Sequence, residues 1–250
     1  MQRVIVPPEA VRGDTVTIDD PGDVHHLLRV LRVKVGAPLE CVDGHGHRYR
    51  GRISRCARSG LMMEIRERFQ DAQAGAQAVP RLVLGQAIIR PERFEWIVEK
   101  ATELGVGRIS PLVTERTVIR LSGDQAERKR QRWARIAREA TAQCGRSVIP
   151  TVDSPSSLEA FLDSLTPSPM IFIPTLAVNG SPLREALEAR GPTASAVVLI
   201  GPEGDFTRGE VEMARRHGAV PVSLGRATLR AETAAIAVLA ILRYALKVGE

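Results

Sequence analysis

Two short segments in the last third of the chain combine glycines with ionisable side chains. Residues 201–207 read Gly-Pro-Glu-Gly-Asp-Phe-Thr and follow an apolar stretch at residues 196–200. The glycines let the backbone approach a ligand closely, and Glu203 adds a carboxylate inside the turn. Thr207 and Glu210 have the spacing of a capping box, which predicts that a helix begins here. A plain strand-to-helix turn would explain the glycines and the cap, but not the carboxylate at Glu203.

The second segment, residues 223–234, reads Ser-Leu-Gly-Arg-Ala-Thr-Leu-Arg-Ala-Glu-Thr-Ala and runs from a predicted strand into the last helix. Arg230, Glu232 and Thr233 gather at the N-terminus of that helix, where free N–H groups and the helix dipole favour a carboxylate or an anionic ligand. The alternative is that Glu232 and Thr233 only complement the helix end. Neither segment contains Gly-x-Gly-x-x-Gly or Gly-Lys-Ser/Thr, which argues against a phosphate-binding ATPase and an ordinary dinucleotide enzyme.

The elements that position these segments alternate between strands and helices from residue 80 onward. This order predicts an α/β fold with a mostly parallel sheet covered on both faces. Ligands of such sheets bind beyond the carboxyl ends of the strands, here after Ile173, Ile200 and Leu224. The predicted strands are 82–89, 108–113, 149–152, 170–174, 196–200 and 220–224, and the predicted helices are 91–104, 125–143, 157–165, 183–189, 210–216 and 231–246.

The first seventy residues show short strands and turns, with one short helix predicted at residues 23–29. Five strands, at residues 3–6, 15–18, 38–42, 49–54 and 61–68, predict a small barrel, and Asp43-Gly44 marks a hairpin-type turn. Residues 71–79 are small and polar, as in a linker. We therefore expect domains at residues 1–70 and 80–250, joined by a linker at residues 71–79.

The composition favours a polyanionic partner. The 250 residues carry a net charge of +6 and include 31 arginines and four lysines. Arginine pairs with phosphate and stacks on bases, although a genome-wide preference for arginine would give the same count.

We expect a cytoplasmic protein, because the N-terminus lacks the apolar region of a signal peptide and Arg243 interrupts the apolar last helix. The three cysteines are expected to be buried thiols, and the histidine spacings match no metal site.

Together the two segments resemble the bacterial 16S ribosomal RNA uridine-N3 methyltransferase family of the SPOUT superfamily. The family pattern is Gly-Pro-Glu-Gly-x-Phe-[Ser/Thr]-x-x-Glu followed by Leu-Gly-x-x-x-Leu-Arg-x-Glu-Thr-Ala. Residues 99–106, 128–150 and 25–32 also match the family, in the same order along the chain. The sequence departs from the pattern at Asp205, Ala227 and Ala231, where the family usually has glycine, arginine and threonine.

The resemblance implies a PUA-like RNA-binding barrel, followed by a SPOUT-like methyltransferase domain with a trefoil knot. It also implies a homodimer that binds S-adenosyl-L-methionine largely through backbone groups. By position in the motifs, the expected cofactor-binding residues are Thr175, Leu176, Gly201, Glu203, Gly204, Leu224, Gly225, Thr228 and Leu229.

Methylation of uridine N3 in 16S ribosomal RNA requires an acceptor for the N3–H proton, within hydrogen-bond reach. We expect Glu232 to fill this role, with Glu203 as the alternative, and Arg230 to stabilise the oxyanion that develops at a uracil carbonyl. Two other functions remain open: another RNA methyltransferase of this superfamily, acting on a ribose 2′-hydroxyl or a transfer RNA base, and a non-catalytic RNA-binding protein of ribosome assembly.

The partners expected are 16S ribosomal RNA, within the small ribosomal subunit, and a second copy of the chain. The last helix is apolar on nearly every face, which favours a dimer. Arginines are dense in the N-terminal module and along the helix at residues 125–143, where the apolar stripe prevents them all from pointing inward. The expected RNA-binding residues are Arg29, Arg32, Arg128, Arg132, Arg135 and Arg146.

Overall fold

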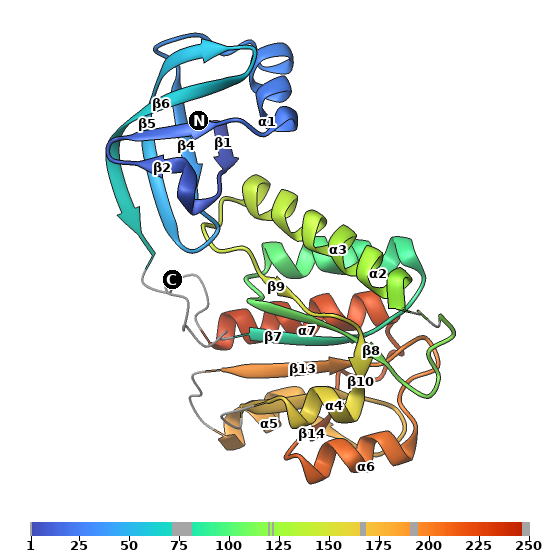
Figure 1. Ribbon diagram of the computed structural model, residues 1–250. Coiled ribbons are helices and arrows are strands. Elements are labelled where there is room, and N and C mark those ends of the chain that lie inside the picture. Colours follow the sequence, from blue (N-terminus) through green and yellow to red (C-terminus); the bar gives the residue numbers. More distant parts are fainter. Residues whose placement is uncertain are drawn as a thin grey trace. The chain divides into compact units, whose positions relative to one another are not determined.

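The computed structural model describes residues 2–71, 82–119, 121, 123–165, 169–190 and 195–246, the side chain of Arg190 excepted (Figure 1). Apart from Asp71, the predicted linker lies outside the described residues. The chain divides into two compact units. The first comprises Met1–Ala78 with Thr141–Ile149, and the second comprises Val79–Ala140 with Pro150–Glu250.

The first unit is built on a six-stranded sheet with the order β1-β4-β5-β6-β3-β2. β1 pairs with β4 in parallel, and the other neighbours are antiparallel. The five predicted strands are present, and β2 was missed because a two-residue strand carries no alternation. The strands are β1 (Gln2–Ile5), β2 (Val11–Arg12), β3 (Thr15–Ile18), β4 (Pro38–Val42), β5 (His47–Ala57) and β6 (Gly60–Gln70).

The short helix of this unit starts earlier than predicted. α1 (Pro21–His25) has Pro21 in its first turn and is capped by the Asp20 carboxylate, which accepts a hydrogen bond from Asp23 N. A π-helical turn, His26–Val30, continues it, and a 3₁₀ turn covers Pro8–Ala10. The predicted turn at Gly44 has the left-handed φ of +76° that favours glycine.

Residues 141–149, at and just after the C-terminal end of helix α3 (Gly123–Cys144), complete the first unit. Val148 forms an isolated antiparallel bridge with His45, and Ile149 N donates to Gly44 O at 2.9 Å. Gly46 N donates to Ser147 O at 3.0 Å. The turn after β4 is thus fastened by backbone bonds to a segment about a hundred residues later in the chain.

The second unit has an eight-stranded sheet in which every pairing is parallel, with the order β10-β8-β7-β13-β11-β14-β12 and β9 paired with β8. This confirms the predicted parallel sheet. The strands are β7 (Leu82–Ala87), β8 (Arg108–Val113), β9 (Thr151–Val152), β10 (Ser156–Ser157), β11 (Met170–Pro174), β12 (Ser181–Pro182), β13 (Ala196–Ile200) and β14 (Val220–Ser223).

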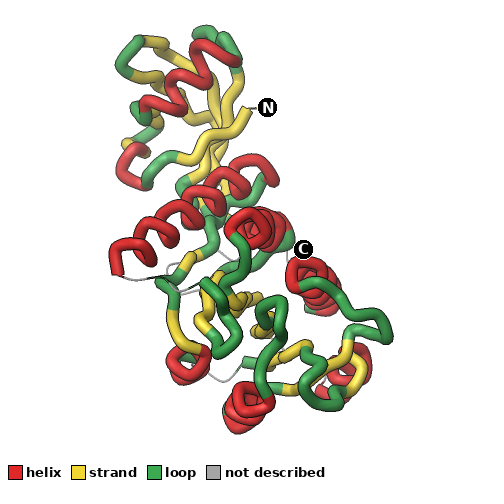
Figure 2. Tube along the Cα trace, turned by 90° about the vertical axis from the view of Figure 1, so that its right-hand side faces the viewer, coloured by secondary structure: helices red, strands yellow, loops and turns green. Residues whose placement is uncertain are grey.

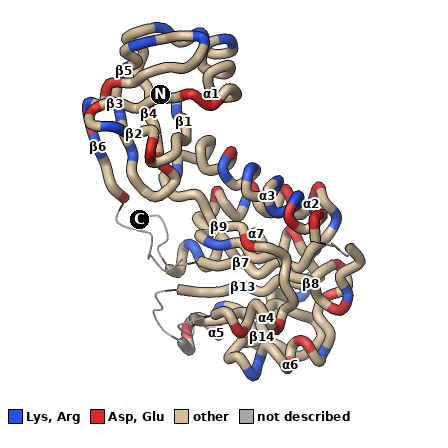
Figure 3. The backbone as a smooth tube through the Cα atoms, in the orientation of Figure 1, with Lys and Arg blue, Asp and Glu red and all other residues tan. Residues whose placement is uncertain are grey.

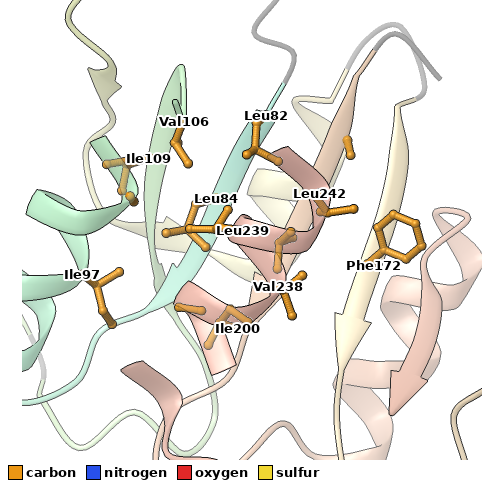
Figure 4. Close-up of a cluster of buried hydrophobic side chains, with 14 of the residues drawn as sticks. Leu82, Leu84, Ile97, Val106, Ile109, Phe172, Ile200, Val238, Leu239 and Leu242 are labelled. Atoms are coloured by element: carbon orange, nitrogen blue, oxygen red, sulfur yellow. The ribbon is translucent and has the colours of Figure 1, made fainter. Parts of the chain in front are cut away.

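Two apolar clusters cover the two faces of this sheet, because alternate side chains of a strand point to opposite faces. One cluster contains Leu82 and Leu84 together with residues of α2, α3 and α7, and Figure 4 shows part of it. The other contains Val83 and residues of α4 and α6. In Figure 2 the strands of this unit run between helices. The helices are α2 (Pro91–Glu103), α3 (Gly123–Cys144), α4 (Leu158–Asp163), α5 (Leu183–Arg190), α6 (Arg208–Arg216) and α7 (Ala231–Ala245).

The expectation of three buried thiols is correct for Cys41 alone. Cys41 is fully buried, and this burial raises the pKa of its thiol to about 12. Cys56 is half-buried and Cys144 is exposed, so for them the expectation was wrong. Cys144 is the last residue of α3, so no further turn of the helix covers it, and its Sγ donates to Thr141 O at 3.7 Å. Within the described residues, no helix is long and apolar enough to cross a membrane.

Candidate active site

The loops that follow β11, β13 and β14 enclose a pocket of about 270 Å³ in the second unit. These strands are neighbours in a parallel sheet, so their carboxyl ends meet at the same edge. The pocket lies where the pattern of strands and helices predicts ligand binding. The predicted residues that line it are Thr175, Leu176, Gly201, Glu203, Leu224, Gly225, Thr228, Leu229 and Arg230.

Glycines bring the backbone to the pocket wall. A Cβ at Gly201 would lie 3.1 Å from Phe206 N, which is tighter than ordinary contacts. Gly225 has a φ of +116°, a conformation that side chains rarely adopt. The wall also carries apolar side chains, among them Ile200, Leu224 and Leu229. A pocket with an apolar wall and a small number of polar and charged groups is typical of small-molecule and cofactor sites.

Gly204 does not line the pocket, although it was predicted to bind the cofactor. Its carbonyl oxygen accepts a hydrogen bond of 2.5 Å from Arg116 Nη1, in the loop after β8. In the first turn of α6, Glu210 is buried and accepts hydrogen bonds from Glu115 N at 2.8 Å and from Thr207 N at 2.8 Å. The predicted capping box of α6 is therefore present, and the same glutamate joins it to the neighbouring loop.

Asp205 joins two of the pocket loops. Its Oδ2 accepts hydrogen bonds from Thr175 Oγ1 at 2.9 Å and from Leu176 N at 2.6 Å, and its Oδ1 accepts from Phe206 N at 2.7 Å. Thr175 Oγ1 in turn accepts from Ala177 N at 3.0 Å. The loops after β11 and β13 are thus connected through one carboxylate.

The two candidate acids lie on either side of a single arginine, Arg93. Its Nη1 is 4.0 Å from Glu203 Oε1, and its Nε is 3.7 Å from Glu232 Oε1. Glu203 is 44% exposed and lines the pocket. Glu232 is 16% exposed, contacts Arg93 rather than lining the pocket, and its Oε2 is buried without a hydrogen-bond partner. Buried carboxylate oxygens are nearly always paired, so this unpaired oxygen calls for an explanation.

Arg230 lies at the junction between the pocket and α7. It is the N-cap residue of the helix, with extended backbone (φ −66°, ψ 154°) and no capping bond from its side chain. The residue is exposed and lines the pocket. Arg230, Glu203 and Arg93 therefore line the same pocket, and Glu232 is joined to it through Arg93.

Arg93 was not among the predicted site residues. It belongs to the first turn of α2, which Pro91 opens shortly after the carboxyl end of β7. β7 lies between β8 and β13 in the sheet, so its carboxyl end is at the edge where the pocket forms. The rule that located the other loops would have found Arg93 if it had been applied to β7 as well.

The predicted RNA-binding arginines belong to both units. In the first unit, Arg29 and Arg32 are exposed, whereas Arg146 is partly buried and takes part in an interaction. In the second unit, Arg128, Arg132 and Arg135 are on α3, along which basic residues recur (Figure 3). Arg132 donates two hydrogen bonds to Glu95, at 2.6 and 2.8 Å, and Arg135 donates one to Glu139 at 2.8 Å.

The chain matches models of known protein families over most of its length. Residues 77–243 match the model of an RNA methyltransferase domain, and residues 18–56 match that of an RNA methyltransferase PUA domain. The chain is 31% identical to the ribosomal RNA small subunit methyltransferase E of Synechocystis, over 95% of this chain and 76% of that protein. The chain belongs to the ribosomal RNA small subunit methyltransferase E family. The Bacillus subtilis member is 25% identical over 89% of this chain and 87% of its own length.

Solved structures of this family have the same fold. The Neisseria gonorrhoeae methyltransferase E, bound to S-adenosyl methionine, superimposes with a TM-score of 0.83 at 29% identity, covering 97% of each chain. A putative methyltransferase of Legionella pneumophila with bound cofactor gives a TM-score of 0.82 at 29% identity, also covering 97% of each chain. The predicted family, and with it the PUA domain, is confirmed.

Proposed function

We propose that this chain methylates N3 of a uridine in the 16S ribosomal RNA of the small subunit, with S-adenosylmethionine as methyl donor. One observation carries the proposal. The pocket between the three loops has Arg93, Glu203 and Arg230 at its wall, and the partnerless Oε2 of Glu232 belongs to a side chain that contacts Arg93. Such a site offers a binding surface for a small molecule beside groups that can accept a proton and stabilise a negative charge.

The size and the lining of the pocket suit S-adenosylmethionine. Its volume of about 270 Å³ is close to the lower end of the range for small-molecule sites, and the site is open to solvent on one side for a second substrate. Leu176, Leu224 and Leu229 offer apolar surface for a purine, and Gly201 and Gly225 bring backbone to the pocket wall. When bound, the cofactor supplies a methyl group on a sulfonium, whose carbon–sulfur bond breaks as the N3–carbon bond forms.

The residues of this chain have to hold the uracil and remove its imide proton. Because N3 lies on the Watson–Crick edge, the target uridine must be unpaired when it reaches the site. We assign the proton to the carboxylate of Glu232, whose free Oε2 is the available acceptor. Arg230 stabilises the negative charge that develops at a uracil carbonyl. Arg93 contacts both Glu203, at the pocket wall, and Glu232, in the first turn of α7, and keeps these two side chains in place.

Three further features belong to the proposal. Backbone groups of residues 175–176, 201–203 and 224–229 bind the cofactor, within a fold that contains a trefoil knot. The protein acts as a homodimer in the cytoplasm. Arginines of the N-terminal module and of α3 bind ribosomal RNA around the target nucleotide, and the rest of the small subunit contributes to recognition.

Two measurements test the function. Isothermal titration with S-adenosylmethionine should show saturable binding, which a protein that only binds RNA would lack. After incubation with unmodified 16S RNA or small subunits, mass spectrometry of the digested nucleosides should detect 3-methyluridine. A ribose-methylated nucleoside instead would overturn the N3 assignment, and the absence of cofactor binding would overturn the methyltransferase assignment as a whole.

A further inference from the structure

The turn after β13 contains a residue whose backbone conformation is costly for its type. Asp205 has a φ of +61°, in the left-handed region that glycine adopts readily and other residues adopt at a cost. Among the described residues other than glycine, only Arg32 also has a positive φ. Positions of this kind persist when surrounding contacts compensate the cost, and they often serve a site.

The compensating contacts of Asp205 lead to the pocket. Asp205 and its hydrogen-bond partners Thr175 and Leu176 all line it. Thr175 is 8% exposed, and its hydroxyl donates to Asp205 and accepts from Ala177 N. Leu176 is 70% exposed, so its backbone bond to Asp205, rather than side-chain packing, holds this part of the loop.

We propose that Asp205 is a positioning residue that fixes the loop after β11 against the loop after β13 and thereby sets the affinity for S-adenosylmethionine. This inference rests on the proposed function. Two loops that contact the same ligand lose conformational freedom when the ligand binds, and a bond already present between them lowers that entropic cost. The carboxylate acts on the ligand through Thr175 and Leu176, and it takes no part in the methyl transfer.

Three variants separate positioning from folding. Asp205→Gly removes the carboxylate and suits the left-handed backbone, so the unfolding temperature should be unchanged or slightly higher. Its Kd for S-adenosylmethionine should rise roughly tenfold, as expected for the loss of a hydrogen bond to a charged group. Asp205→Asn tolerates the same backbone and keeps one acceptor oxygen, so it should recover most of the affinity. Thr175→Val removes one partner, and combining it with Asp205→Gly should cost less than the sum of the two single effects.

Titration with both S-adenosylmethionine and S-adenosylhomocysteine identifies the cause of any loss. A positioning role predicts the same fold-change for both, because they share the loop contacts and differ only in the sulfonium. It also predicts that KM for the cofactor rises while KM for RNA and kcat at saturation stay within about twofold. Asp163→Asn, which removes a similar charge from an exposed site outside the pocket, is the matched control.

The possible outcomes are distinct. If the wild-type protein fails to bind S-adenosylmethionine, the proposed function fails before Asp205 is tested. If the wild type binds but a folded Asp205→Gly variant binds equally well, the positioning role is overturned. A loss restricted to S-adenosylmethionine would also overturn it, in favour of direct attraction between the carboxylate and the sulfonium.

Discussion

Glu232 combines two properties that a helix-end residue does not need. It is only 16% exposed, and one of its oxygens is buried without a partner, although it lies in the first turn of α7, where solvent or backbone N–H groups commonly satisfy a carboxylate. Leaving a buried acceptor unpaired costs on the order of 1–3 kcal/mol. This cost is understandable if the oxygen accepts a proton or a hydrogen bond from substrate.

Glu232→Gln should therefore reduce the single-turnover rate on the order of 10²–10³-fold while leaving S-adenosylmethionine affinity close to that of the wild type. The change keeps the size of the side chain and removes its basicity. Glu212→Gln, at an exposed position of α6, is the control and should turn over normally. If a folded Glu232→Gln protein keeps the wild-type rate, Glu232 is only a helix-end residue, and Glu203→Gln becomes the decisive variant.

A second carboxylate, in the first unit, contributes to stability rather than to chemistry. Glu40 is 2% exposed and accepts hydrogen bonds from Arg3 Nε at 2.6 Å and Arg50 Nε at 2.7 Å. Burial alone would raise its pKa, but the hydrogen bonds from Arg50 and Arg3 outweigh this and lower the pKa below 4.5. Stabilisation from Glu40 is then present above about pH 4.5 and is lost as the pH falls through the lower, folded value.

At pH 7, Glu40→Gln should lower the free energy of unfolding by about 1–3 kcal/mol, because it removes the charge that both arginines pair with. Urea unfolding measured between pH 7 and pH 3 should show the difference from wild type shrinking as the acid protonates Glu40. Glu64→Gln, an exposed glutamate on β6, should change stability by less than about 0.5 kcal/mol at any pH. A constant difference down to pH 3 would contradict the assigned pKa direction.

At the scale of elements, α3 combines a buried apolar stripe with arginines that pair with glutamates. Trp133 and Ala137 are buried against the sheet domain, and Phe94 lies against the Trp133 ring at a centroid distance of 4.4 Å. Arg132 and Arg135 pair with Glu95 and Glu139, so each has to exchange a carboxylate for a phosphate when RNA binds. Exposed pairs of this kind cost little to break.

Replacing Arg128, Arg132 and Arg135 by alanine should weaken RNA binding and flatten its salt dependence. The slope of log K against log salt should fall by about 0.7–0.9 for every phosphate that is no longer neutralised by an arginine. Filter binding with 16S RNA fragments at several salt concentrations measures the slope. Arg184→Ala, an exposed arginine of α5, should leave it unchanged. An unchanged slope in the triple variant would make α3 an ordinary solvated helix.

The sequence predicted the longer elements well and missed most of the two-residue strands. β3, β4, β8, β11 and β13 have the predicted bounds, because each is an apolar or alternating run that ends at turn residues. β10 and β12 were missed because two residues cannot display a period. In the site, the three loops were predicted. Arg93 was missed, although it follows the carboxyl end of β7 in the same way, and no local pattern reveals the pairing of β7 with β13.

At the scale of the whole molecule, α7 leaves apolar surface uncovered. Val238, Leu239 and Leu242 are buried by the chain's own sheet and by α2, while Ile241 is 45% and Tyr244 is 87% exposed. A helix with a second apolar face usually packs on another subunit, most often about a two-fold axis. The face that carries Ile241 and Tyr244 is where we expect a second copy to bind.

Light scattering at micromolar concentration should give a dimer mass, and a variant with Ile241→Asp and Tyr244→Asp should give a monomer. Val118→Asp introduces the same charge at a position that is 91% exposed and lies outside α7, so it should remain dimeric. A monomeric wild type, or a double variant that stays dimeric, would remove α7 from consideration as an interface.

The division of roles between the two units can be tested by point changes rather than by truncation. Deleting residues 1–70 would strip the backbone partners of Ser147 and Ile149, so a truncated chain would expose a segment that is normally bonded. Arg29 and Arg58 line a hollow of about 390 Å³ in the first unit, and Arg32 is close to Arg29 in sequence. Changing all three to alanine should weaken RNA binding and leave the Kd for S-adenosylmethionine unchanged. A large change in cofactor affinity would contradict this division.

The strand order of the parallel sheet also has a consequence for the chain during its synthesis. β7 pairs on one side with β8, which follows it closely, but on the other side with β13, more than a hundred residues later. At about 5–20 residues per second, a ribosome needs on the order of 5–20 s to make the intervening segment. During that interval one hydrogen-bonding edge of a largely apolar strand has no native partner, the condition under which edges recruit other chains. A nascent chain of this protein should therefore be most prone to aggregation, and most dependent on chaperones, between the emergence of β7 and that of β13.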